Sequence, residues 1–218
     1  MKMRAWITPA SLLAVSFIPL ALTASRLVWV AGGEKSAQST PELAHMIALP
    51  WPIVTHIVLG SVFCIIASFQ FAPELRAKFP SWHRAAGRVA AVSGIISALT
   101  GMLMTIIYPL GELSTVPMAV IRFAFGAFMT TSIVLAVFYA MKKSFANHRA
   151  WMIRAFAIGV AGATQGILLG AWLGITGALT KEVVTVMIAV GFAINWAFAE
   201  WRIRKRPASQ LQIKGSAL

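Results

Sequence analysis

Two short segments of the sequence share a run of histidine, arginine and alanine. The first reads S-W-H-R-A-A-G-R over 81–88 and the second reads N-H-R-A-W-M-I-R over 147–154, so that His83 and His148 lie 65 residues apart. Histidine is a usual ligand of haem iron and a usual proton relay in membranes. The arginine that follows in each segment can hold a carboxylate. This combination suits a cofactor that carries both a metal and acidic groups.

Both segments are expected at the start of a helix. Ser81 and Asn147 are good N-cap residues, which would place each motif histidine in a first helical turn. Arginine is unfavourable there beside the positive end of the helix dipole, and Arg84 and Arg88, four residues apart, repel each other. For the arginines alone, contact with lipid phosphates is the simpler explanation. The histidine that precedes the arginine in both segments favours instead a bound cofactor that carries a metal and negatively charged groups.

These residues form the candidate cofactor site. We predict one haem b, with His83 and His148 as its axial metal ligands near the cytoplasmic face. Four arginines would hold the propionates or a quinone oxygen: Arg84, Arg88, Arg149 and Arg154. His56 is expected to serve an outer site. A single haem is more credible than two, because the outer half offers only His45 and His56, which belong to one helix neighbourhood.

His56 is expected about one and a half turns inside an apolar span, where an unpaired polar group is costly. Gly60, Cys64 and Ser68 follow it at four-residue steps. This groove of small side chains can receive a neighbouring helix or a flat ligand, and both interpretations stay open. His45 lies in an outer connection and has a weaker claim to be a ligand.

The composition is that of a membrane protein. Of the 218 residues 59% are hydrophobic and 11% charged, against about a quarter charged in soluble domains. We expect an all-α, multi-pass fold with a single domain over 1–201, a core over 45–180 and a basic tail over 202–218. The second to fifth spans should form a central four-helix bundle. Six spans of about 20 residues are expected, near Thr8–Val30, Trp51–Phe71, Arg88–Pro109, Ile121–Met141, Trp151–Ile175 and Val183–Trp201.

The charges predict the orientation. Nineteen lysines and arginines oppose six glutamates and no aspartate, for a formal net charge of +13. With a cytoplasmic N-terminus, fifteen of the nineteen fall on the inner side, so the positive-inside rule places both termini in the cytoplasm. Anionic headgroups, rather than nucleic acid, are the expected partner of this charge. The first span resembles a secretory signal but is longer than a usual signal core, so we expect it to stay uncleaved.

Several classes of site are excluded. One cysteine, Cys64, rules out an internal disulfide, a Cys-rich zinc site, a Cys-ligated iron–sulfur cluster and the attachment of c-type haem. No carboxylate lies in the middle of a span, which disfavours ion-coupled transport. There is no phosphate-binding G-x-x-x-x-G-K-[ST] loop and no H-E-x-x-H motif, so neither an ATP-driven pump nor a hydrolase has support.

Small residues recur on two spans. Gly162, Gly166, Gly170 and Gly174 form an unbroken small face on the fifth span, and the third span offers Ala90, Gly94, Ala98 and Gly101. Helix packing explains such faces, although a porphyrin also needs them. The deep amides of Gln165 and Asn195 are expected to face neighbouring helices.

Three stretches carry a family resemblance: T-H-I-V-L-G at 55–60, F-Q-F-A-P-E-L-R-A-K-F-P-S-W-H-R-A-A-G-R at 69–88 and H-R-A-W-M-I-R-A-F-A at 148–157. The chain resembles the bacterial predicted membrane proteins of domain of unknown function 2306 (DUF2306), over roughly 45–180. One departure is Gln165, where family members often have arginine. The resemblance implies a bacterial inner membrane, and importance for His56, Gln70, Arg76, His83, Arg84, Gly87, Arg88, His148, Arg149, Trp151, Met152 and Arg154.

The histidines on antiparallel helices are similar to those of b-type cytochromes and ferric reductases. We therefore expect a haem protein that moves electrons in the membrane, with a quinol, the reduced form of a quinone, or another redox partner as electron donor. Whether it is an enzyme stays open. The alternatives are a non-redox scaffold, a lipid-binding or accessory subunit, or a facilitator for a small neutral solute.

Overall fold

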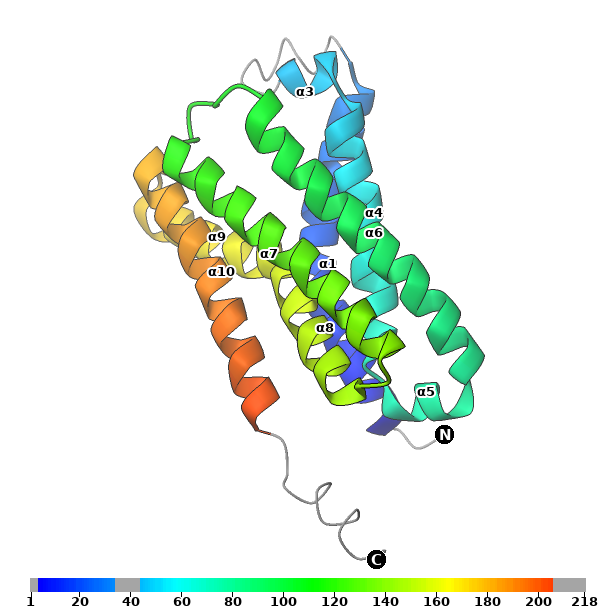
Figure 1. Cartoon of the computed structure of the whole chain (residues 1–218). Coiled ribbons are helices and arrows are strands. Elements are labelled where there is room, and N and C mark those ends of the chain that lie inside the picture. Colours follow the sequence, from blue (N-terminus) through cyan, green and yellow to red (C-terminus); the bar gives the residue numbers. More distant parts are fainter. Residues whose placement is uncertain (1–3, 34–43, 206–218) are drawn as a thin grey trace, which may run out of the picture.

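The computed structural model describes residues 4–33 and 44–205, and every regular element in these ranges is a helix. The fold class is therefore confirmed as all-α for the part described. Figure 1 shows the helices, which are α1 (Arg4–Ala31), α3 (Ala44–Ala48), α4 (Trp51–Gln70), α5 (Pro73–Lys78), α6 (Pro80–Ile107), α7 (Val116–Met141), α8 (Phe145–Gly159), α9 (Ala161–Thr176) and α10 (Lys181–Arg204).

Five stretches are long and apolar enough to cross a membrane. They are α4, α6, α7, the pair α8 and α9, and α10, and they correspond to the second to sixth expected spans. The first expected span lies in α1, a 28-residue helix that is not among these five. Five candidate spans are thus established, and the sixth stays a prediction.

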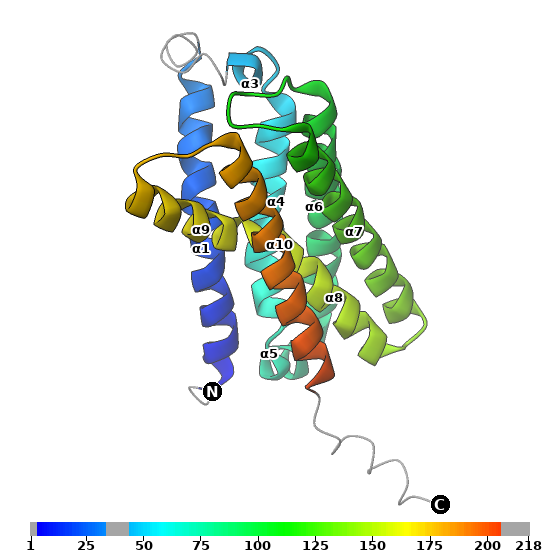
Figure 2. The ribbon, with the colours of Figure 1, turned by 90° about the vertical axis from the view of Figure 1, so that its left-hand side faces the viewer.

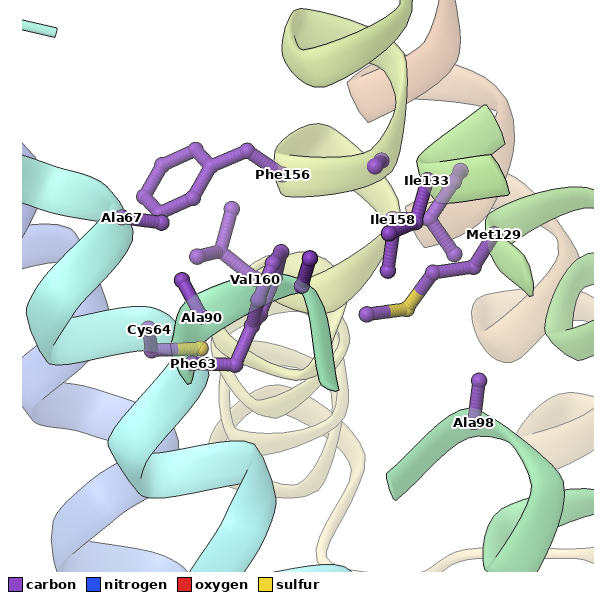
Figure 3. Packing of buried hydrophobic residues seen from close by; sticks show 12 residues of the cluster. Phe63, Cys64, Ala67, Ala90, Ala98, Met129, Ile133, Phe156, Ile158 and Val160 are labelled. Carbon is purple, nitrogen blue, oxygen red and sulfur yellow. The ribbon is translucent and has the colours of Figure 1, made fainter. Parts of the chain in front are cut away.

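The long helices pack in the order of the chain. α4 packs against α6, α6 against α7, α7 against α8, and α8 makes contact with α4 again. α10 lies against α8 and α9, whereas α1 lies against α4 and α9, as Figure 2 shows from the side. The buried core gathers between α4, α6, α7 and α8 (Figure 3), with Phe63, Ala67, Ala90, Met129, Ile133 and Phe156 among its members.

One end of the molecule is strongly basic. The first residues of α1, the whole of α5, the starts of α6 and α8 and the last residues of α10 lie together there (Figure 1). We name it the basic end, and the opposite one the α3 end. The expected grouping of basic connections on one side agrees with this arrangement, and its assignment to the cytoplasm stays a prediction. Residues of these elements include Arg76, Lys78, Arg84, Arg88, Arg149, Arg202 and Arg204.

The fifth expected span is not one continuous helix, which corrects the prediction of Trp151–Ile175. α8 ends at Gly159, and α9 starts at Ala161 and runs in a different direction (Figure 2). A Cβ atom on Gly159 would lie 2.7 Å from Cε1 of Phe63, so the phenyl ring occupies the place of a side chain at the break. Glycine is a poor helix former. It is nevertheless required at position 159, because any side chain there would clash with the Phe63 ring.

Candidate functional site

Both helices that carry the motif histidines begin earlier than expected. The N-cap of α6 is Phe79, followed by Pro80, and the N-cap of α8 is Ser144. The predicted N-caps Ser81 and Asn147 are therefore wrong. Proline suits the first helical position because its missing N–H needs no partner there, which sets the start of α6.

The two histidines nevertheless occupy the same position in their helices. His83 is the fourth residue of α6 and His148 the fourth residue of α8. Each backbone N–H donates to the carbonyl of its N-cap residue, Phe79 or Ser144, at 3.0 Å. His83 and His148 thus have equivalent backbone positions, as the repeated motif predicted.

The structure brings these histidines together at the basic end. His83 and His148 are both half-buried and close enough to interact electrostatically, and Arg76 and Arg84 also act on His83. Nδ1 of His148 lies 2.9 Å from the backbone oxygen of Ala136 on α7. Because a carbonyl only accepts, the neutral ring carries its proton on Nδ1 and keeps the lone pair of Nε2 available.

Gln70 is a further polar group beside this pair. It ends α4, and a Cβ atom on Gly87, one turn after His83, would lie 3.4 Å from Oε1 of Gln70. Its Nε2 atom is buried and has no hydrogen-bond partner in the part of the chain described. A buried donor without an acceptor costs about 1–3 kcal/mol. The sequence pointed to Gln70 only through the family resemblance, because nothing in its spacing shows that it faces α6.

Arg154 is engaged elsewhere. Its Nε donates to Oε1 of Glu200 at 2.6 Å and its Nη2 to Oε2 at 3.1 Å, and its guanidinium carbon lies 4.5 Å from the centre of the Trp151 ring. This two-bond ion pair joins α8 to α10. Sequence reasoning missed it, since the only available signal was a glutamate at the end of the sixth span.

We expect Arg154 and Glu200 to stabilise the fold as a unit. Replacing either with alanine leaves a charge at a position where the two side chains are only 20% and 22% exposed. In a double-mutant cycle of Arg154→Ala and Glu200→Ala, thermal unfolding should give a coupling free energy of about 1–2 kcal/mol. The same cycle with the exposed Arg202 in place of Arg154 is the control. Equal couplings in the two cycles would contradict the assignment.

The remaining arginines of the candidate site lie at the surface of the basic end. Arg84, Arg88 and Arg149 are exposed, and Nε of Arg88 donates to the backbone oxygen of Arg84 at 3.3 Å. Arg84, like Arg76, interacts electrostatically with His83.

His56 lies in the half of α4 that is nearest the α3 end, and it is hydrogen-bonded to α6. Its Nδ1 is 2.8 Å from the backbone oxygen of Ser97, and Oγ of Ser97 donates to the backbone oxygen of His56 at 3.0 Å. A Cβ atom on Gly60 would lie 2.9 Å from Oγ of Ser97, and one on Gly101 would lie 3.0 Å from Cε1 of His56. The small groove of α4 is therefore filled by a neighbouring helix, one of the two interpretations left open.

His45 is separate from the motif histidines. It lies in the short helix α3, with its ring 5.0 Å from that of Tyr108, and loss of hydration lowers its pKa below the usual value. Its place at the α3 end gives it no part in the histidine pair at the basic end.

The small face of the fifth span is only partly a packing surface. Nothing lies within 4 Å of a Cβ atom built on Gly170 or Gly174, because the end of α9 is exposed. The deep amides do meet α10 and α9 as expected. A Cβ atom on Gly191 would lie 2.5 Å from Cγ of Gln165, and Oδ1 of Asn195 accepts a bond from Thr164 at 3.2 Å.

Long apolar helices and a family match define the class of this chain as an integral membrane protein. The family model described as "Predicted membrane protein (DUF2306)" matches residues 53–203, so the chain belongs to this family. The match extends beyond the expected 45–180 at its C-terminal side and includes α10. No curated protein and no solved structure matches the chain.

Proposed function

We propose that this membrane protein binds one haem b between His83 and His148 and transfers electrons in a bacterial inner membrane. The observation that carries the proposal is the pairing of two half-buried histidines at equivalent positions of α6 and α8. α6 and α8 lie on opposite sides of the group formed by α4, α6, α7 and α8, which we treat as a four-helix bundle. Opposed helices suit two axial ligands on one iron.

The donor set fits haem better than a bare metal ion. No group of three or more metal-ligating His, Cys, Asp or Glu side chains occurs in the described residues. A bare zinc ion usually needs at least three protein ligands, whereas haem brings four nitrogens of its own and requires two more. The fixed Nδ1–H of His148 supports this use, since axial and metal-bound histidines commonly donate their second N–H to a carbonyl.

The surrounding cations suit the acidic edge of a porphyrin. Arg84, Arg88 and Arg149 at the basic end would hold the propionates, and the buried Nε2 of Gln70 would donate to an oxygen of the same ligand. Arg154 would keep α8 in position through Glu200 rather than bind the ligand itself. When bound, haem supplies an iron that takes up and releases single electrons. A quinol is the proposed electron donor, and anionic headgroups would border the basic end.

The first test is the visible spectrum of the wild-type protein. Purified from membranes supplied with haem, it should show a reduced low-spin α-band and about one haem per chain, because two imidazoles complete six-coordinate iron. The measurement is a reduced-minus-oxidised spectrum with haem quantified against protein. A colourless but folded preparation would reject the proposal and favour the non-redox scaffold.

A further inference from the structure

A second group of basic side chains lies at the α3 end, far along the helices from the histidine pair. Arg122 on α7 interacts electrostatically with His56 on α4 and with Arg26 on α1. α4 and α7 begin at this end and α1 finishes there (Figure 1). Arg122, His56 and Arg26 stand six, five and five residues from those helix ends, which is about 8–9 Å along a helix. The three side chains are therefore at a similar depth.

Arg122 belongs to the inward face of its helix. It follows Met118 by four residues and precedes Met129 by seven, which places the three on one helical stripe. Met118 and Met129 are 2% and 7% exposed, but Arg122 between them is exposed. Arg122 therefore belongs to the inward stripe of α7 and still keeps accessible surface there.

The charge of Arg122 has no counter-ion in the described residues. The single ion pair found there joins Arg154 to Glu200, at the other end of the molecule. Within residues 4–33 and 44–205 no hydrogen bond of the Arg122 guanidinium is present, and the positive charge of Arg26 repels it. An unpaired arginine within an apolar span is costly, so such residues usually mark a functional site.

His56 adds an acceptor to these donors. Its Nδ1–H is held by the backbone oxygen of Ser97, so the neutral ring presents the lone pair of Nε2. Close packing of Cε1 against Gly101 fixes the orientation of the ring. Two guanidinium groups and an imidazole acceptor can together bind a protonatable oxyanion through charge and through its hydroxyl hydrogen.

We infer that Arg122, Arg26 and His56 form a binding site for a small oxyanion of the phosphate or carboxylate type at the α3 end. The anion relieves the repulsion between the two arginines and supplies the counter-ion that the described residues lack. It is either the phosphate of a lipid headgroup or a soluble anion that enters from that side. The site is independent of the proposed haem, which would lie at the basic end.

The test measures thermal unfolding in neutral detergent, with inorganic phosphate or chloride at equal ionic strength. At about ten times its dissociation constant, phosphate should raise the wild-type midpoint by about 3–6 °C. Arg122→Gln should start from a higher midpoint, because it removes the repulsion, and should lose the response. Arg122→Lys should keep a weaker response. Arg202→Gln, the same change at an exposed site of the basic end, is the matched control and should respond like the wild type.

Native mass spectrometry of the same preparations separates the two sources of the anion. A phosphate response without retained lipid identifies a soluble ligand. A phospholipid retained by the wild type and lost in Arg122→Gln, with a phosphate response only after lipid removal, identifies a headgroup. A wild type with neither response nor retained lipid, or an Arg122→Gln variant that matches the wild type, overturns the inference. Because the haem spectrum reports on the opposite end, each hypothesis can fail without the other.

Discussion

Replacing His148 with alanine is expected to abolish the reduced low-spin α-band of the haem-loaded protein. The iron would lose one of two axial imidazoles and become high-spin, or the haem would be lost altogether. His83→Ala should have the same effect, since the two histidines occupy equivalent positions in α6 and α8. The change should be nearly complete in both variants, as seen in reduced spectra normalised to protein.

Two controls separate ligation from general damage. His45→Ala, in α3 at the other end of the molecule, should leave the band unchanged, and so should His56→Ala. His148→Gly should regain a low-spin spectrum when imidazole is added, because the free ring can take the vacated place. If the band survives in both His83→Ala and His148→Ala, those residues are not the ligands.

Replacing Gly94 with alanine is expected to give the largest loss of stability of any single methyl addition proposed for this fold. Its Cβ atom would lie 2.7 Å from Cδ2 of Phe63 and 2.8 Å from Cδ1 of Ile133. Both neighbours are fully buried, so neither can move aside freely. Overpacking of this kind costs about 1–3 kcal/mol. Thermal unfolding in detergent should show a lower midpoint.

Gly170→Ala is the matched control for this substitution. Nothing lies within 4 Å of a Cβ atom at that position of α9, so only helix propensity should change. The variant should be unchanged or more stable by up to about 1 kcal/mol. A loss equal to that of Gly94→Ala would show that the packing around Gly94 is looser than the distances indicate.

Much of the helical layout could be predicted from the sequence, because length and hydropathy alone define a span. The matched positions of His83 and His148 could also be predicted, since a repeated motif implies a repeated backbone environment. The break after Gly159 could not. It depends on the ring of Phe63, almost a hundred residues earlier in the chain, and no local pattern reports that contact.

The sequence also did not allow the partners of the charged residues to be predicted. Arg154 and Arg122 both sit in apolar helices, but Arg154 binds Glu200, whereas Arg122 interacts with His56 and Arg26 and has no carboxylate partner in the described residues. Their different roles follow from which helix lies opposite, and helix order around a bundle is not encoded in local spacing. The two N-cap predictions failed for a simpler reason, because α6 already starts at Pro80, before Ser81, and α8 starts at Phe145, before Asn147.

The break between α8 and α9 changes which helices cover α7 near the α3 end. A straight continuation of α8 would run on beside α7 toward the α3 end, but α9 turns aside and packs on α1 and α10 (Figure 2). Near the α3 end the inner stripe of α7 therefore packs, at Met118, against Leu169 of α9 and Val184 and Ile188 of α10 instead of against α8. The irregularity after a single glycine thus gives the two ends of one helix face different neighbours, so that substitutions at the two ends of α7 should be felt by different helices.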